Sequence, residues 1–103
     1  MATAALTCDD VEREVSPCVT HVNSMGKKAE VECCKGARTL NKMAQTPADH
    51  REACKCIKNI LHRMRESEEG LTGEMESFAG TLPGKCGAIN VPYKISLSTN
   101  CDD

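Results

Sequence analysis

Eight cysteines are the feature that most constrains how this chain of 103 residues can fold. They are Cys8, Cys18, Cys33, Cys34, Cys54, Cys56, Cys86 and Cys101. An even number of cysteines spread over a short chain predicts a disulfide framework, which replaces part of the hydrophobic core that a small domain cannot build. Leu, Ile, Val and Phe together number only 17, so the chain needs such a framework. We therefore expect one stapled domain over residues 1–103, with residues 1–5 as a flexible N-terminal extension.

The number of cysteines also bears on the compartment in which the protein folds. Four disulfides require an oxidising environment, so we expect a secreted, extracellular protein. The residues before the first cysteine lack the basic and apolar segments of a signal peptide, which we expect to have been removed. No uncharged run approaches the length of a membrane-spanning helix, so the mature protein is expected to be soluble.

Charge and motifs argue against several other classes of protein. A net charge of −2 is not that of a nucleic-acid binder. Zinc sites need paired ligands two to four residues apart, whereas the close cysteines are the pairs at 33–34 and 54–56. We expect His21, His50 and His62 to be solvated helix residues. Because no nucleophile motif or Gly-rich phosphate loop is present, we expect a protein that is not an enzyme, without catalytic residues, metal or cofactor.

The first half of the chain predicts two amphipathic helices. A helix over 9–23 should start at Thr7, which has an acid three residues later, and Pro17 should bend it. Its apolar positions are Val11, Val15, Cys18, Val19 and Val22. A second helix over 28–44 should end before Thr46 and present one apolar face. The members of that face are Val31, Cys34, Ala37, Leu40 and Ala44.

A stronger helix start follows at 46–49, where Thr, Pro, Ala and Asp combine a capping hydroxyl, proline at the first helical position and an acid. The third helix that begins here should turn Ala53, Cys54, Ile57, Ile60, Leu61 and Met64 inward. The acidic segment 65–73 is expected to be a loop. A short fourth helix should precede Pro83-Gly84, with Leu71, Met75, Phe78, Ala79 and Leu82 at helical spacing. Residues 87–103 should form an extended tail held by cysteines.

The cysteine spacing is Cys-x9-Cys-x14-Cys-Cys-x19-Cys-x-Cys-x29-Cys-x14-Cys, which resembles the eight-cysteine framework of plant seed and cell-wall proteins. Three further motifs accompany it: Leu6-Thr7-Cys8, the Thr-Pro-Ala-Asp-His-Arg-Glu-Ala-Cys-Lys-Cys-Ile-Lys run over 46–58, and Leu-Pro-Gly-Lys-Cys-Gly over 82–87 with Pro-Tyr-Lys-Ile-Ser over 92–96. With these motifs the chain most resembles the type 1 non-specific lipid transfer proteins, over residues 6–101.

This resemblance implies an all-α fold, a right-handed bundle of four helices with an extended C-terminal tail around a hydrophobic tunnel. It also implies the pairs Cys8–Cys56, Cys18–Cys33, Cys34–Cys86 and Cys54–Cys101, whereas eight cysteines alone allow 105 pairings. The related type 2 proteins exchange the partners of the Cys-x-Cys pair. A charged Lys55 between these two cysteines belongs on the outside, as in type 1 members.

The function implied by the resemblance is the binding and transfer of lipid monomers, namely fatty acids, lysolipids and phospholipids. The candidate lipid-binding residues are Val11, Val15, Val19, Ala37, Leu40, His50, Arg51, Ile57, Ile60, Met64, Met75, Phe78, Tyr93, Ile95 and Leu97. The family places an arginine near the lipid head group at the position of His50, so either His50 or the neighbouring Arg51 is expected to make this contact. Tyr93 keeps its family position and can offer its hydroxyl. The 29-residue gap between Cys56 and Cys86 is longer than is usual.

Two other functions fit the same framework. An inhibitor of a digestive protease or amylase would need a rigid exposed loop, for which the acidic 65–73 segment is the candidate. Membrane disruption in defence is disfavoured because a protein of net charge −2 has no general attraction to anionic bilayers. We expect a monomer that binds a fatty acid or phospholipid, makes at most transient membrane contact and serves in cell-wall lipid transport or defence in the plant apoplast or cell wall.

Overall fold

Threonine side chains start three of the four helices in this computed structural model, which describes residues 5–88 and 91–102. Thr7 caps α1 (Cys8–Asn23), Thr46 caps α3 (Pro47–Glu66) and Thr72 caps α4 (Gly73–Cys86). Each hydroxyl accepts the backbone N–H three residues later, which satisfies a donor that has no partner within the helix. In α1 the Asp10 carboxylate accepts the N–H of Thr7 in return, at 3.1 Å. The helix starts expected at Thr7 and Thr46 are confirmed.

The remaining helix, α2 (Glu30–Met43), has no capping side chain and begins after an irregular turn. Met25, Gly26 and Ala29 all have positive φ, with 61° at Ala29. A residue in this left-handed conformation cannot continue a right-handed helix. This explains why α2 starts two residues later than the sequence pattern predicts.

Two helices run further than expected toward their C-terminal ends. The expected end of the fourth helix before Pro83 is wrong, because α4 continues through Pro83 to Cys86 and ends at Gly87, whose φ is 73°. Proline costs one hydrogen bond to the carbonyl four residues earlier but permits helical φ, so the last turn of α4 forms around it. Helix α3 extends to Glu66, which leaves a connection of residues 67–72. Helix α1 is likewise continuous through Pro17, and the bend expected there stays a prediction.

The apolar face of α2 differs from the expected one at Val31. The buried residues of α2 are Cys33, Gly36 and Leu40, whereas Val31 is 73% exposed. Nine residues at about 100° each place Val31 on the opposite side of the helix from Leu40. The expectation that Val31 belongs to the buried face is therefore wrong.

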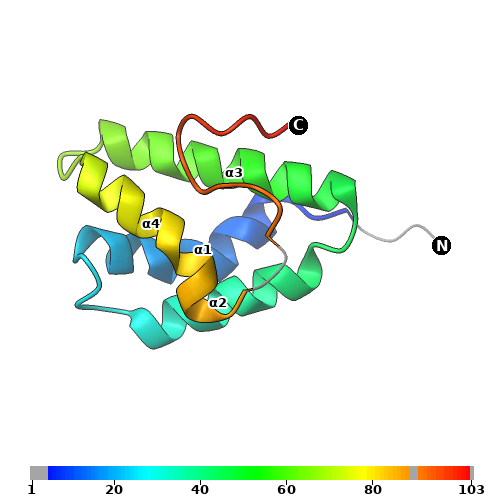
Figure 1. Cartoon of the computed structure of the whole chain (residues 1–103), viewed down its shortest axis with the longest axis horizontal. Coiled ribbons are helices and arrows are strands. Elements are labelled where there is room, and N and C mark those ends of the chain that lie inside the picture. Colours follow the sequence, from blue (N-terminus) through cyan, green and yellow to red (C-terminus); the bar gives the residue numbers. More distant parts are fainter. Residues whose placement is uncertain (1–4, 89–90, 103) are drawn as a thin grey trace.

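The helices enclose a central space rather than forming a closely packed layer. Figure 1 shows α2 along one side of the molecule, α3 along the other, and α1 and α4 between them. Helix α1 packs most extensively on α2, and the two backbones meet at Gly36. A Cβ atom at that position would lie 1.6 Å from the carbonyl oxygen of Glu14. The chain extends 43 × 26 × 21 Å.

Four disulfides connect these elements in the pairing that the family resemblance implies. The bonds are Cys8–Cys56, Cys18–Cys33, Cys34–Cys86 and Cys54–Cys101. Cys54 and Cys56 are buried while Lys55 between them is exposed, which agrees with the argument made from the charge of Lys55. The bonds join α1 to α3, α1 to α2, α2 to α4, and α3 to the tail.

Two small hydrophobic clusters lie beside the central space. The first contains Val22, Cys33, Leu61, Met64, Met75, Ala79 and Leu82, and the second contains Leu6, Val11, Leu40, Ala44, Ala53 and Cys56. Against expectation, His21 is not solvated but 4% exposed, because its ring packs on Phe78 with the centroids 5.2 Å apart. Its Nδ1 atom lies 2.8 Å from the carbonyl oxygen of Lys28, which satisfies one ring nitrogen.

The C-terminal segment has neither helix nor strand at residues 88 and 91–102, as expected for an extended tail. Figure 1 shows it crossing α3. Residues 1–4 of the expected N-terminal extension, and residues 89–90 and 103 of the expected tail, lie outside the described part of the chain. Within the described residues, no helix combines the length and the apolar character needed to cross a membrane.

Candidate functional site

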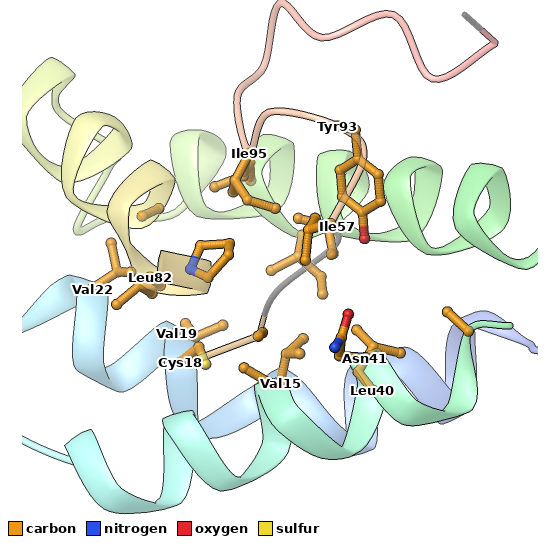
Figure 2. A pocket seen from close by; sticks show the side chains of 18 of the residues that line it. Val15, Cys18, Val19, Val22, Leu40, Asn41, Ile57, Leu82, Tyr93 and Ile95 are labelled. Carbon is orange, nitrogen blue, oxygen red and sulfur yellow. The ribbon is translucent and has the colours of Figure 1, made fainter. Parts of the chain in front are cut away.

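A cavity of about 110 Å³ lies between the four helices and the tail. Its wall is formed by Val15, Cys18, Val19, Val22, Ala37, Leu40, Asn41, Ala44, His50, Ile57, Ile60, Leu61, Met64, Ala79, Leu82, Pro83, Ala88, Val91, Tyr93 and Ile95. Most of these side chains are aliphatic, and they come from every helix as well as from the tail (Figure 2). Such a space favours an aliphatic ligand, because each buried methylene contributes about 0.8 kcal/mol.

Three polar side chains interrupt this apolar wall: Asn41 of α2, His50 of α3 and Tyr93 of the tail. Figure 2 shows the Tyr93 hydroxyl directed into the cavity toward the side where Asn41 lies, while Val22 and Leu82 line the other end. Burial raises the pKa of Tyr93 to about 12, so its hydroxyl remains a neutral hydrogen-bond donor at physiological pH. The cavity is therefore polar at one end and apolar at the other.

The polar end adjoins a second hollow, an outer groove that carries positive charge. The groove is lined by Pro47, His50, Arg51, Pro92, Tyr93, Lys94, Thr99, Asn100 and Cys101. It shares His50 and Tyr93 with the cavity, and Arg51 and Lys94 are exposed in it. The site thus combines an apolar interior with a polar mouth and two cationic side chains outside it, a combination suited to an anionic amphiphile.

Ten of the fifteen residues expected to bind lipid line the cavity. They are Val15, Val19, Ala37, Leu40, His50, Ile57, Ile60, Met64, Tyr93 and Ile95. Helical periodicity accounts for the apolar members on α1, α2 and α3, because each of these helices turns an apolar stripe toward the same central space, whereas Tyr93 and Ile95 come from the tail.

The other five expected residues do not line the cavity. Val11 is fully buried in the second cluster, and Met75 is buried in the first. Phe78 and Leu97 pack against that first cluster. Arg51 lines the outer groove but not the cavity. An apolar residue at helical spacing is predicted to face inward, but it can either pack in the hydrophobic core or line the cavity. The spacing alone does not distinguish these two positions.

Several wall residues are absent from the expected set, and Asn41 and Pro83 are the informative ones. Asn41 follows Leu40 directly in the sequence. A polar residue at the edge of an apolar helix stripe could have predicted a polar group in the cavity wall. Pro83 reaches the wall because α4 continues past the position where its end was expected. The others are Cys18, Val22, Ala44, Leu61, Ala79, Leu82, Ala88 and Val91.

A carboxylate on α4 holds the tail that completes the cavity wall. Glu76 accepts the backbone N–H of Leu97 at 2.8 Å and the hydroxyl of Ser96 at 2.9 Å. These hydrogen bonds, with that of the Leu97 N–H the larger influence, lower the pKa of Glu76. The contact fixes the segment that carries Tyr93 and Ile95 over the cavity.

One grouping of possible metal ligands occurs within the described residues, around Cys8, Glu52 and Cys56. The Glu52 Oε2 atom lies 3.9 Å from both sulfur atoms. Because Cys8 and Cys56 are joined in a disulfide, neither sulfur is a thiolate that could bind a cation. This grouping therefore does not form a metal site.

The fold and the eight-cysteine framework place the chain in a known family. Residues 8–101 match the model of the protease inhibitor/seed storage/LTP family, and the chain belongs to this family.

Within that family, the proteins similar to this chain include lipid transfer proteins of plants. A non-specific lipid-transfer protein of Malus domestica is 44% identical over 97 residues, which are 94% of this chain and 76% of the relative. Non-specific lipid transfer protein 1 from barley, solved in complex with lysophosphatidylcholine, has a TM-score of 0.76 and 33% identity, covering 94% of this chain and 97% of that one. The wheat protein, solved with two molecules of phospholipid, has a TM-score of 0.73 and 33% identity, covering 93% and 97%.

Proposed function

We propose that this protein binds lipid monomers in the cavity and transfers them between membranes or surfaces. The observation that carries this proposal is the polarity of the cavity, whose wall is mostly aliphatic, with Asn41 and Tyr93 toward one end (Figure 2) and with His50 and Tyr93 shared with the outer groove. The acyl chain would lie among the aliphatic side chains, and the head group would lie at the polar end beside the cationic groove. The barley and wheat relatives, which were solved with lysophosphatidylcholine and phospholipid, support this assignment.

Recognition would rest mainly on the chain rather than on the head group. Each methylene moved from water into the cavity contributes about 0.8 kcal/mol, whereas a contact with an exposed cation such as Arg51 is screened by water and salt. This predicts broad selectivity among head groups and a clear dependence on chain length. The proposed role is that of a carrier, in which no bond of the ligand is made or broken.

The structure also bears on the head-group contact that the sequence left open between His50 and Arg51. His50 lines both the cavity and the outer groove, while Arg51 lines only the groove. We therefore propose that His50 and Tyr93 meet the polar atoms next to the acyl chain, and that Arg51 and Lys94 attract the outer part of an anionic head group.

The proposed setting is outside the cell, where the oxidising environment preserves disulfides. Four of them hold this protein together, and its relatives are plant proteins. We propose that residues 1–103 act as one monomeric unit in the apoplast or cell wall, in lipid transport or defence. The inhibitor alternative has less support, because the connection it would use is shorter than expected and spans residues 67–72.

The test is a titration with saturated fatty acids of increasing length, read by displacement of a fluorescent fatty acid. Affinity should rise with each methylene until the cavity is filled and then level off. Ala37→Phe should abolish binding by filling the cavity, whereas the same change at the exposed Ala48, on the outside of α3, should not affect it. Equal, weak affinity for all chain lengths in the unmodified protein would contradict the proposed function.

A further inference from the structure

The exposed face of α2 is strongly cationic, although the protein as a whole is acidic. Residues 25–42 contain five Lys or Arg side chains and two Glu side chains, so a segment of net charge +3 belongs to a chain of net charge −2. The cationic residues are Lys27, Lys28, Lys35, Arg38 and Lys42, and all five are exposed. The rest of the chain therefore has a net charge of −5.

Four residues of α2 form one stripe on the surface. Val31, Lys35, Arg38 and Lys42 follow each other at intervals of four, three and four residues, which places them within about 60° around the helix. Lys27 and Lys28 precede the stripe in the turn before α2. We refer to Lys27, Lys28, Val31, Lys35, Arg38 and Lys42 as the basic face. Glu30 and Glu32 lie about 100° to either side of Val31.

The positive charge of the basic face is not neutralised by ion pairs. Among residues 5–88 and 91–102, the Lys and Arg side chains within 4.0 Å of a carboxylate are Arg13, Lys55 and Arg63. None of them belongs to the basic face. Arg38 donates a hydrogen bond to the carbonyl oxygen of Cys86, which orients the guanidinium without removing its charge.

Apolar side chains accompany these cations. The large hydrophobic residues exposed in the described part of the chain are Met25, at 44%, and Val31, at 73%. Met25 lies in the turn that carries Lys27 and Lys28, and Val31 lies in the basic face itself. A surface that combines cations with exposed aliphatic groups fits a partner that offers both negative charge and an apolar phase.

We infer that the basic face docks on an anionic lipid bilayer. The cations would meet the phosphate groups, while Val31 and Met25 would enter the boundary between head groups and acyl chains. A soluble polyanion would neutralise the cations but would offer no apolar phase in which to bury Val31 and Met25. Ala37 and Leu40, on the other side of α2, line the cavity, so docking through the basic face does not use these lipid-binding side chains.

The net charge of −2 does not prevent this contact. Figure 1 shows α2 on the side of the molecule opposite α3, whose end leads into the acidic 67–72 connection. In this view α2 and α3 lie apart along the direction in which the molecule extends 26 Å, whereas charges in 0.1 M salt are screened beyond about 10 Å. A bilayer that touches α2 is therefore influenced mainly by the basic face. This qualifies the expectation, drawn from net charge alone, that anionic bilayers do not attract the protein.

The test compares two double variants that change the net charge equally. Lys35→Gln with Lys42→Gln alters the basic face, and Lys55→Gln with Arg65→Gln alters exposed cations on α3. Binding of the protein without added fatty acid is measured by co-sedimentation with vesicles of phosphatidylcholine, alone or with phosphatidylglycerol, in 0.1 M NaCl. The unmodified protein should bind only the anionic vesicles. The first pair should weaken that binding by roughly 25-fold, about five-fold for each lysine, and the second pair should change it by less than two-fold.

A third variant, Met25→Ser with Val31→Ser, distinguishes a bilayer from a soluble polyanion. We expect it to weaken vesicle binding while the net charge stays the same. Unchanged binding of this variant would mean that charge alone holds the protein on the vesicle, as it would on any polyanion, and would overturn the inference, as would equal losses in the two charge variants or no binding of the unmodified protein. Fatty-acid titration of the same proteins reports on the cavity separately, so failure of the docking inference and failure of the proposed function are distinguishable.

Discussion

Tyr93 and His50 are the two side chains that belong both to the cavity and to its outer groove. Their position matters more than their charge, because a polar group at the boundary can contact the head of a ligand whose chain is already buried. The hydroxyl of Tyr93 keeps its proton over the whole physiological range, since burial raises its pKa to about 12. It can therefore donate to a carboxylate or phosphate at any pH at which the protein would act.

We predict that Tyr93→Phe weakens the binding of an ionised fatty acid by about 1 kcal/mol, because it removes one hydrogen bond and keeps the ring that packs the tail. The loss should be constant between pH 7 and pH 9, where the hydroxyl stays protonated. Arg51→Ala should cost less, since Arg51 contacts only the wet groove. Titrations with a single fatty acid at three pH values check this, and a larger loss for Arg51→Ala would show that the outer cation governs recognition.

At the scale of the helices, the closest approach is that of α1 and α2 at Gly36. Only a glycine allows this contact, because a Cβ atom would lie 1.6 Å from the carbonyl oxygen of Glu14, which is backbone and cannot rotate away. The disulfide Cys18–Cys33 fixes the same pair of helices less than one turn of α2 away from Gly36. The two constraints together determine how far the α1 and α2 walls of the cavity stand from each other.

We predict that Gly36→Ala lowers the free energy of unfolding by about 3 kcal/mol, at the upper end of what overpacking costs, because the helices must move apart. Denaturation with guanidinium chloride measures the effect. The control is Gly84→Ala, at a helical position where a Cβ atom meets nothing within 4 Å. This change should leave stability unchanged or raise it by up to about 1 kcal/mol. Similar effects of the two substitutions would mean that α1 and α2 are not in such close contact.

The contact between α4 and the tail depends on the ionised form of Glu76. Hydrogen bonds from Leu97 and Ser96 lower the pKa of this carboxylate below its ordinary value of 4.5. Because the folded-state pKa is the lower one, the stabilisation is fully present above about pH 4.5 and is lost as the pH falls through the lowered value.

We predict that Glu76→Gln lowers stability by roughly 1 kcal/mol at pH 7, a modest amount because the carboxylate is open to solvent. The difference from the unmodified protein should shrink as the pH falls to about 3. Glu74→Gln, in the same turn of α4, is the matched control, since Glu74 makes no hydrogen bond to the tail within the described residues. Thermal unfolding between pH 3 and pH 7 provides the measurement, and a constant difference across this range would contradict the proposed role of the carboxylate.

The helices themselves could be predicted from the sequence wherever a local signal determines the backbone. Thr7 and Thr46 start helices because their side chains replace missing backbone partners within three residues of chain. The exposure of Val31 could not be predicted this way. Two stripes of α2 contain apolar residues, and only tertiary packing decides which of them is buried. Pro83 shows the same limit, since contacts of α4 with α2 and the tail outweigh the local preference to end the helix.

At the scale of the whole molecule, three of the four disulfides close long loops, with sequence separations of 47 to 52 residues. Such bonds stabilise a fold by restricting the unfolded chain, which compensates for the scarcity of large apolar side chains. The pairing followed from the resemblance to a family rather than from the positions of the cysteines. The cavity was likewise not determined by composition, because a chain with few large side chains can also form a small solid core.

We predict that replacing Cys54 and Cys101 together by alanine lowers stability by about 2–4 kcal/mol. This bond attaches the end of the tail to α3, and the tail supplies Tyr93 and Ile95 to the cavity wall. Fatty-acid affinity should therefore fall more than stability alone explains, at a temperature where the variant is fully folded. Hydrogen exchange should show faster exchange in the tail than in the helices, and unchanged affinity would indicate that the tail is held by its other contacts.

The separation of charge between α2 and the 66–76 segment gives the molecule an electric dipole moment. That segment contains five glutamates and no Lys or Arg, while the basic face contains five cations. A negatively charged surface exerts a torque on such a molecule before the two touch, and the torque turns α2 toward the surface. Encounters are then productive more often than for a uniformly charged particle of the same net charge. An acidic protein built in this way can adsorb to a cation exchanger at neutral pH, where its isoelectric point of about 5.9 suggests that it should flow through.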